Sequence, residues 1–253
     1  MKKIVMFLIL SLFGSLFLFS QEETDSIPTP HKQIVRMGGA GGFTPLLLFW
    51  NVKNVNESMS SLPQFPHFKD QPMVLLGGQG YGYIMFIQNL RIGGMGAGGS
   101  QSSSVVGLDG YRRDADIDIS FGGGTVEYSI PITERFDLVP GIMLGGGGID
   151  LNLRKDKPSN KIWNELINEY GSSDSTGNFR RTFKGSFFIF QPSLNFEYAL
   201  LRWVGLRVGV SYVGMISPSW KLDDAFDVVS VPDKLSGKGL MINAGVFLGT
   251  FLF

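Results

Sequence analysis

The sequence predicts an all-β fold: an eight-stranded antiparallel transmembrane β-barrel with short helices in the extracellular loops. Three observations predict it. Bulky and small residues alternate along several segments, the connections between these segments are alternately short and long, and a short apolar leader precedes them. After that leader, no segment reaches the ~18 consecutive apolar residues that a transmembrane helix requires. If the chain crosses a bilayer, it therefore crosses with strands.

The N-terminus has the pattern of a secretory signal peptide, which we expect to occupy residues 1–20. Two lysines precede an apolar run over residues 4–19, and a polar segment follows. The alternative is an uncleaved membrane anchor, although this run is short for a spanning helix. We expect residues 21–33 to form a periplasmic tether and residues 34–253 to form the barrel.

The composition excludes several classes of function. The chain carries 22 basic and 22 acidic side chains, so it has no electrostatic footprint for nucleic acid. It has no cysteine, which excludes disulfides, a lipoprotein anchor, thiolate metal ligands and cysteine nucleophiles. We expect no cofactor.

The clearest strand evidence is a hairpin around the short connection 200–202. Bulky residues occupy the even positions from Phe188 to Tyr198 before this connection, and from Val204 to Tyr212 after it. Such alternation on both sides of a short connection predicts two antiparallel strands. In a transmembrane barrel the bulky face meets lipid and the small, polar face lines the interior. The predicted strands are 34–43, 73–86, 89–100, 115–130, 135–153, 180–199, 203–216 and 239–253.

The connections between these strands alternate in length. The short ones lie at 87–88, 131–134 and 200–202, and the long, polar ones at 44–72, 101–114, 154–179 and 217–238. Outer-membrane barrels have short periplasmic turns, long extracellular loops and an even number of strands. Every predicted connection obeys this rule. Aromatic residues also gather near the predicted periplasmic rim, as in an aromatic girdle: Phe86, Tyr128, Phe136, Phe196, Tyr198, Trp203, Phe251 and Phe253.

The last residues, G-V-F-L-G-T-F-L-F, place Phe247, Phe251 and Phe253 on one face, which we expect to meet lipid. This ending resembles the C-terminal signature of bacterial outer-membrane β-barrel proteins, an aromatic residue preceded by alternating apolar ones. The resemblance implies the small eight-stranded type, located in the cell outer membrane and in contact with its lipid. It also implies insertion by the barrel-assembly machinery.

Residues 91–99 read R-I-G-G-M-G-A-G-G, and Gly94, Gly96 and Gly99 match the G-x-G-x-x-G spacing of a dinucleotide-binding loop. That loop requires a following helix N-terminus, whereas Gly99 precedes the serine-rich segment 100–104, which we expect to be a loop. Similar glycine density recurs at 77–82, 122–124 and 145–148. We therefore interpret the glycines as strand residues that relieve crowding where the barrel bends or where another element approaches its wall.

Two segments show helical rather than β spacing. The first, 45–57, follows Thr44 as the N-cap, and the second, 160–170, ends before a glycine. The even residues of 240–248 are apolar and are expected to face inward, which an aqueous pore would not favour. The first helix is therefore expected either to cover this wall in the barrel mouth or to lie on the outer surface at the headgroups. Its plug or cap residues are Leu48, Trp50, Val52 and Val55.

Charged residues fall on the predicted polar faces of several strands, and in a narrow barrel they are expected to pair inside it. The orientation of Glu127 is ambiguous, because the alternation over 115–130 fits neither face throughout unless a bulge at 122–124 resets it. The predicted interior charges are Arg36, Arg91, Glu127, Glu197 and Arg207.

No motif predicts catalysis. His67 and Asp70 could supply a base and the group that orients it, but a loop histidine at the surface is the simpler interpretation. Asp114, Asp116 and Asp118 share a strand face without histidine or cysteine, so calcium is the one metal option, and we expect no metal site.

The predicted role is therefore not enzymatic. A barrel of eight strands has room for side chains or one small ligand but not for a wide pore. Its role is structural, a surface interaction, or the holding of a small hydrophobic ligand. The alternatives are a rim enzyme that acts on lipid and a soluble periplasmic barrel that binds a hydrophobic ligand.

Overall fold

A computed structural model describes residues 37–157, 178–231 and 238–251. The predicted signal peptide, the tether, the helix over 160–170, Arg36 and Phe253 lie outside these residues. Among the described residues, no helix is long and apolar enough to span a membrane.

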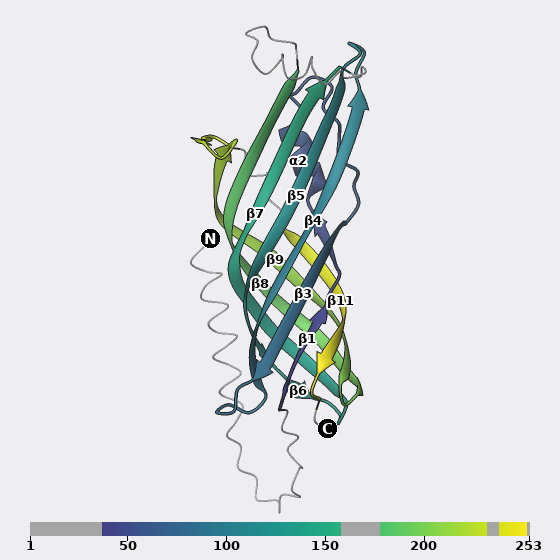
Figure 1. Cartoon of the computed structure of the whole chain (residues 1–253), viewed down its shortest axis with the longest axis vertical. Coiled ribbons are helices and arrows are strands. Elements are labelled where there is room, and N and C mark those ends of the chain that lie inside the picture. The colour runs from purple at the N-terminus through teal and green to yellow at the C-terminus, as the bar shows by residue number, and fades with distance from the viewer. Residues whose placement is uncertain (1–36, 158–177, 232–237, 252–253) are drawn as a thin grey trace, which may run out of the picture. The chain divides into compact units, whose positions relative to one another are not determined.

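The described residues form a closed antiparallel barrel (Figure 1). Its strands are β1 (Gly39–Phe43), β2 (Leu46–Trp50), β3 (Met73–Tyr83), β4 (Leu90–Val106), β5 (Arg112–Tyr128), β7 (Phe136–Asp156), β8 (Phe179–Leu201), β9 (Val204–Leu222) and β11 (Gly239–Gly249), with two-residue strands β6 (Ile130–Pro131) and β10 (Phe226–Asp227) at its ends. β1 and β2 both pair with β3 on one side and with β11 on the other, so they count as one interrupted strand. The pairing of β11 with β9 closes the ring. The prediction of an eight-stranded barrel is confirmed within the described residues.

The alternation of short and long connections is also present, with one exception. β4 and β5 extend to Val106 and from Arg112, so residues 107–111 form a tight turn instead of the predicted loop over 101–114. The segment that follows the G-x-G-x-x-G spacing therefore continues as strand. This excludes the strand–loop–helix context that a dinucleotide site requires.

The helix predicted over 45–57 is wrong in its first half. Leu48 and Trp50 lie in strand β2, and helix α2 covers only Val52–Ser58, with Asn51 rather than Thr44 as its N-cap. The Asn51 side chain accepts a hydrogen bond from the Asn54 backbone N–H at 3.1 Å. The run L-L-L-F-W fits a strand and a buried helix equally well, and backbone pairing with β3 and β11 decides for the strand.

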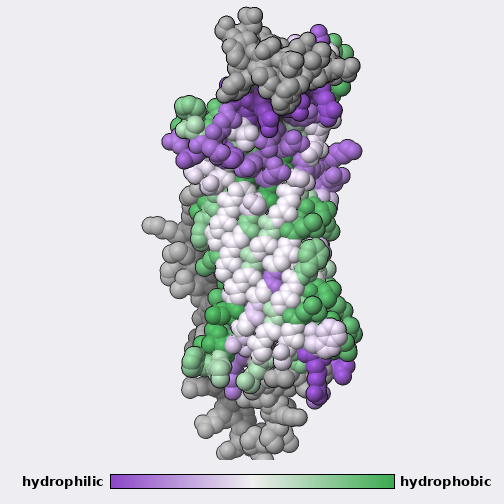
Figure 2. Space-filling model, in the orientation of Figure 1, coloured by the Kyte–Doolittle hydropathy of each residue, from purple (hydrophilic) through white to green (hydrophobic). Residues whose placement is uncertain are grey.

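The barrel has two zones that differ in which face is apolar. In the lower zone, towards the short turns, the exposed outer face carries large apolar residues, among them Phe188, Leu194, Leu206, Val208 and Val210. The inner face there is mainly polar, with a small apolar cluster around Phe247 and Phe251. This is the pattern of a lipid-embedded barrel wall. Figure 2 shows the apolar and neutral surface below a polar upper end.

In the upper zone the pattern is reversed. On β5 the outward residues Asp116 and Asp118 alternate with the buried Ile117 and Ile119. The strand lengths explain why: β8 has 23 residues and β7 has 21, whereas ~9–11 residues cross a bilayer. The extra length extends beyond the lipid, where water covers the outer face and the inner face can form an apolar core.

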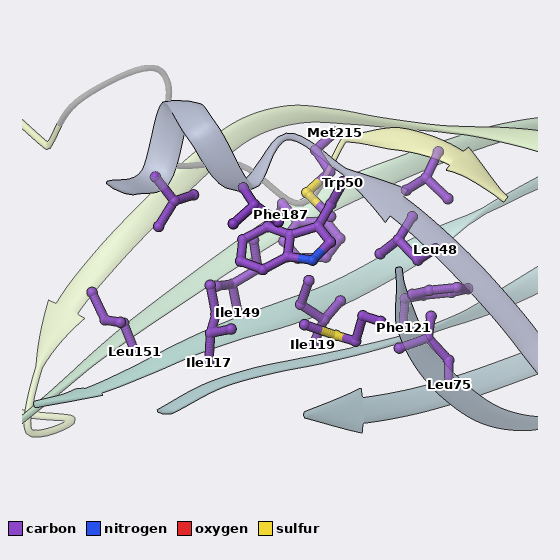
Figure 3. Close-up of a cluster of buried hydrophobic side chains, with 14 of the residues drawn as sticks. Leu48, Trp50, Leu75, Ile117, Ile119, Phe121, Ile149, Leu151, Phe187 and Met215 are labelled. Atoms are coloured by element: carbon purple, nitrogen blue, oxygen red, sulfur yellow. The ribbon is translucent and has the colours of Figure 1, made fainter. Parts of the chain in front are cut away.

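That core fills the inner side of the long strands. Trp50 lies at its centre, with Ile117, Ile119 and Ile149 beside it and Phe187 nearby (Figure 3). The Trp50 indole N–H donates to Gln101 Oε1 at 3.2 Å, which satisfies its polar atom. The upper zone is thus packed like the interior of a water-soluble domain.

The last strand faces the opposite way from our prediction. Phe247 is fully buried and Phe251 is 9% exposed, whereas Leu240 and Val246 are about half exposed to the outside. Both faces of this strand are apolar, so alternation alone could not orient it. Gly42 on β1 lies opposite Phe247 in the register, and an added Cβ there would meet Phe247 Cγ at 2.9 Å, so the absence of a side chain leaves room for the inward ring. Gly205 on β9 does the same for Phe251, whose ring an added Cβ would meet at 2.6 Å.

The glycines fall into two groups. An added Cβ at the inward Gly123 or Gly145 would collide with backbone atoms of the neighbouring strand, so crowding explains these positions. A Cβ at the outward Gly124 would meet nothing closer than 3.9 Å. The crowding interpretation therefore fails for the outward group. The register through 122–124 is continuous and the odd residues of β5 face inward throughout, so the predicted bulge is absent.

Candidate functional site

Four charged side chains from four strands meet inside the lower zone, and we call them the charge cluster: Arg91, Glu127, Glu197 and Arg207. None is more than 4% exposed. Glu127 accepts from Arg91 Nε at 2.8 Å and also from Arg207 Nη2. Arg91 donates through both terminal nitrogens to Glu197, at 3.1 and 3.2 Å.

Neighbouring polar groups complete the charge cluster. Tyr81 donates its hydroxyl to Glu197 at 2.7 Å and lies under the Arg91 guanidinium, 3.7 Å from ring centroid to Cζ. Gln79 donates to Glu127 at 2.9 Å. Two positive and two negative charges cancel, so the cluster fills the interior with neutral, hydrogen-bonded material. Among the described residues, these side chains occupy the interior of the lower zone.

A cavity of about 460 Å³ lies in the upper zone, above the apolar core. Its walls come from strands β5, β7, β8 and β9 and from two loop segments, 58–66 and 228–231. We call it the upper cavity. The side chains that line it are mainly apolar and include Met59, Phe65, Leu151, Leu153, Phe183 and Trp220.

Specific side-chain contacts hold the wall of the upper cavity in place. Trp220 is 7% exposed and lies against Gly185 on β8, where an added Cβ would meet the indole ring at 3.0 Å. Asn56 of α2 exchanges two 2.9 Å hydrogen bonds with the backbone of Phe68, which fastens the loop to the helix. Phe65 packs edge-on against Phe68, with ring centroids 6.0 Å apart.

The rim of the upper cavity is basic. Arg113 and Lys155 are cross-strand neighbours at the ends of β5 and β7. Arg113 donates twice to Asp109, at 2.9 and 2.5 Å, and this hydrogen bonding holds the pKa of Asp109 below its usual range. Lys155 lies over the Tyr111 ring, 4.5 Å from its centroid. Within the described ranges, no carboxylate forms an ion pair with Lys155.

The structure places the predicted site residues as follows. Leu48, Trp50, Val52 and Val55 are all buried in the apolar core, so α2 lies among inward-facing side chains and not on the outer surface. Arg91, Glu127, Glu197 and Arg207 come together in the charge cluster. The loop segments of the upper cavity were not predicted as site residues, because they meet only in the folded chain.

The weaker candidates for chemistry are separated. His67 is exposed, and Asp70 lies 4.0 Å from Lys53. Asp118 accepts from Asn152 on the outer face of the barrel, and Asp114 pairs with Arg112. No group of three or more potential metal ligands occurs in the part of the chain that the structure describes.

The sequence matches no protein-family model and no curated protein. Among solved structures, the barrel is similar to a major outer-membrane protein of Thermus thermophilus, with 8% identity over 84% of this chain and 98% of that chain and a TM-score of 0.44. It is also similar to the outer-membrane protein OprG of Pseudomonas aeruginosa (14% identity, 86% and 94%, TM-score 0.40). A third is the outer-membrane protease OmpT of Escherichia coli (11% identity, 91% and 100%, TM-score 0.31). Likenesses this distant say nothing about function.

The barrel's own features are sufficient to assign its class. A closed antiparallel ring has no free strand edge, and its lower zone is apolar outside and polar inside. A soluble periplasmic barrel would not expose so many large apolar side chains in one belt. Exposed aromatic residues, including Phe196, Tyr198 and Trp203, lie near the short turns, as in an aromatic girdle. This chain is a small, eight-stranded β-barrel of the outer membrane.

Proposed function

We propose that this barrel holds a small apolar ligand in the upper cavity, on the extracellular side of the membrane. The observation that carries this proposal is the pairing of a cavity of about 460 Å³ with a mainly apolar lining. Small-molecule sites typically have ~300–1,000 Å³ and such a lining, with a few polar groups at defined places.

The charge cluster supports a holding role rather than passage through the barrel. It blocks the lower interior with buried, mutually paired side chains. A ligand in the upper cavity would therefore enter and leave from the extracellular side. Each methylene that it buries contributes ~0.8 kcal/mol.

The test uses the tryptophans as reporters. The full chain is labelled with fluorotryptophan, placed in lipid nanodiscs and titrated with dodecan-1-ol, and the fluorine resonances are assigned with Trp→Phe variants. Trp220 lines the upper cavity, whereas Trp203 is 60% exposed at the opposite end of the barrel. We expect a saturable shift of the Trp220 resonance with no matching shift for Trp203.

A matched pair of variants provides the control. Leu153→Glu places a carboxylate in the cavity wall and is expected to abolish the saturable shift. Leu108→Glu makes the same change at a fully exposed turn position and should leave it intact. If Trp220 and Trp203 shift together without saturating, the alcohol has only entered the bilayer and the proposal is wrong.

A further inference from the structure

The basic rim of the upper cavity indicates what kind of ligand fits it. This inference rests on the proposed function and adds a head group to the apolar ligand. We infer that the upper cavity binds a single-chain amphiphile with an anionic carboxylate head, its chain among Leu151, Leu153 and Trp220 and its head at Lys155.

The two cations at the rim, Arg113 and Lys155, differ in their partners among the described residues. Arg113 is engaged by both oxygens of Asp109, so these two side chains together carry no net charge. Lys155 lies beside Arg113 in the register and contacts only the face of Tyr111 among the described groups. With respect to the described residues, the ammonium thus keeps hydrogen-bond donors free at the boundary between the apolar wall and water.

The charges that face this position leave it net positive. The other charged residues that line the upper cavity are Asp114 and Arg154, and each is paired outside it, with Arg112 and Asp156 respectively. Asp109 is a carboxylate that interacts electrostatically with Lys155, and Arg113 already neutralises it. An anionic head group would replace water at Lys155 without displacing an existing salt bridge.

The test compares two ligands of equal chain length in the fluorine assay described above. Dodecanoate at alkaline pH, where the acid is ionised and lysine is still protonated, is compared with dodecan-1-ol. We expect dodecanoate to bind about 10-fold more tightly, which corresponds to ~1.4 kcal/mol. Lys155→Gln should remove most of this preference and leave the affinity for the alcohol within about twofold. Lys184→Gln is the matched control, because Lys184 lies on the outer face and pairs with Asp224 at 2.7 Å.

A second variant is expected to bind dodecanoate more tightly, which a misfolded protein would not do. Asp109→Asn removes the rim carboxylate and frees Arg113, so dodecanoate should bind about threefold more tightly. Equal affinities of the parent protein for dodecanoate and dodecan-1-ol would overturn this inference while the proposed function stands. A Lys155→Gln variant that loses affinity for both ligands by the same factor would do the same. If neither ligand gives a saturable shift of Trp220, the proposed function itself is wrong.

Discussion

Replacing Glu127 with glutamine removes one carboxylate from the charge cluster while nearly preserving its shape. Glu127 accepts hydrogen bonds from Arg91, Arg207 and Gln79, and its side chain is 3% exposed. An amide can accept with one oxygen only, and the charge cluster would keep two arginines against one glutamate. Bulk water does not reach the two guanidinium groups, because both are fully buried.

The expected cost is large. Removing one partner of a buried ion pair typically lowers the free energy of unfolding by ~3–5 kcal/mol, mostly because the remaining charge is left unpaired. Removing a second charge should recover part of this loss. We expect the double variant Glu127→Gln with Arg207→Gln to be more stable than the sum of the single variants by ~1–3 kcal/mol.

The assay is urea unfolding of the barrel in lipid bilayers, followed by tryptophan fluorescence and by the shift in gel migration between folded and unfolded forms. Glu134→Gln makes the same chemical change at an exposed turn position and should alter the free energy of unfolding by less than ~0.5 kcal/mol. A Glu127→Gln variant as stable as this control would refute the view that the charge cluster is tightly coupled.

Two further predictions test packing. Gly123→Ala should lower the free energy of unfolding by ~1–3 kcal/mol, because its Cβ would collide with the neighbouring backbone. Gly124→Ala, with open space outside, should leave the free energy of unfolding almost unchanged. The midpoints of urea unfolding of the two variants are compared, and equal effects would contradict the assignment of inner and outer faces. Trp50→Ala should lower the free energy of unfolding by ~3–5 kcal/mol through the cavity that it leaves in the apolar core. Phe226→Ala, at a site 69% exposed, should lower the free energy of unfolding far less. Faster proteolysis of the 51–72 segment in Trp50→Ala alone would support this prediction, and resistance of Trp50→Ala equal to that of the parent protein would count against it.

The sequence was sufficient to predict the strands but not their full length. Period-2 alternation predicts most of the long strands because their two faces contrast, whereas β11 is apolar on both faces. Asp116 and Asp118 alternating with Ile117 and Ile119 carried the signal for the upper zone. On its own this signal predicts a bulge at 122–124, because a uniformly lipid-embedded wall requires the opposite pattern. Because the long strands extend beyond the bilayer, their outer face is apolar in the lower zone and polar in the upper zone, and no bulge is needed to explain the change.

The candidate site was less predictable for two physical reasons. Phe247 lies on a strand whose faces are both apolar, so alternation does not predict its orientation, and its inward ring is accommodated by Gly42 on the neighbouring strand β1. The upper cavity is lined by Phe65, Leu153 and Trp220, which come from distant parts of the chain. No local sequence pattern predicts that these residues lie close together. The role of the C-terminal aromatic residues in insertion by the assembly machinery stays a prediction.

The reversal of inner and outer faces is the claim on which the position of the upper cavity outside the membrane depends, and labelling tests it directly. Because the chain has no cysteine, Val208→Cys and Asp116→Cys each give a single site for an environment-sensitive fluorophore in bilayer-embedded barrels. We expect nitroxides on the lipid acyl chains to quench the label at position 208, and a water-soluble quencher to reach the label at position 116. Quenching of both labels from the lipid would place the upper zone in the membrane and contradict the account.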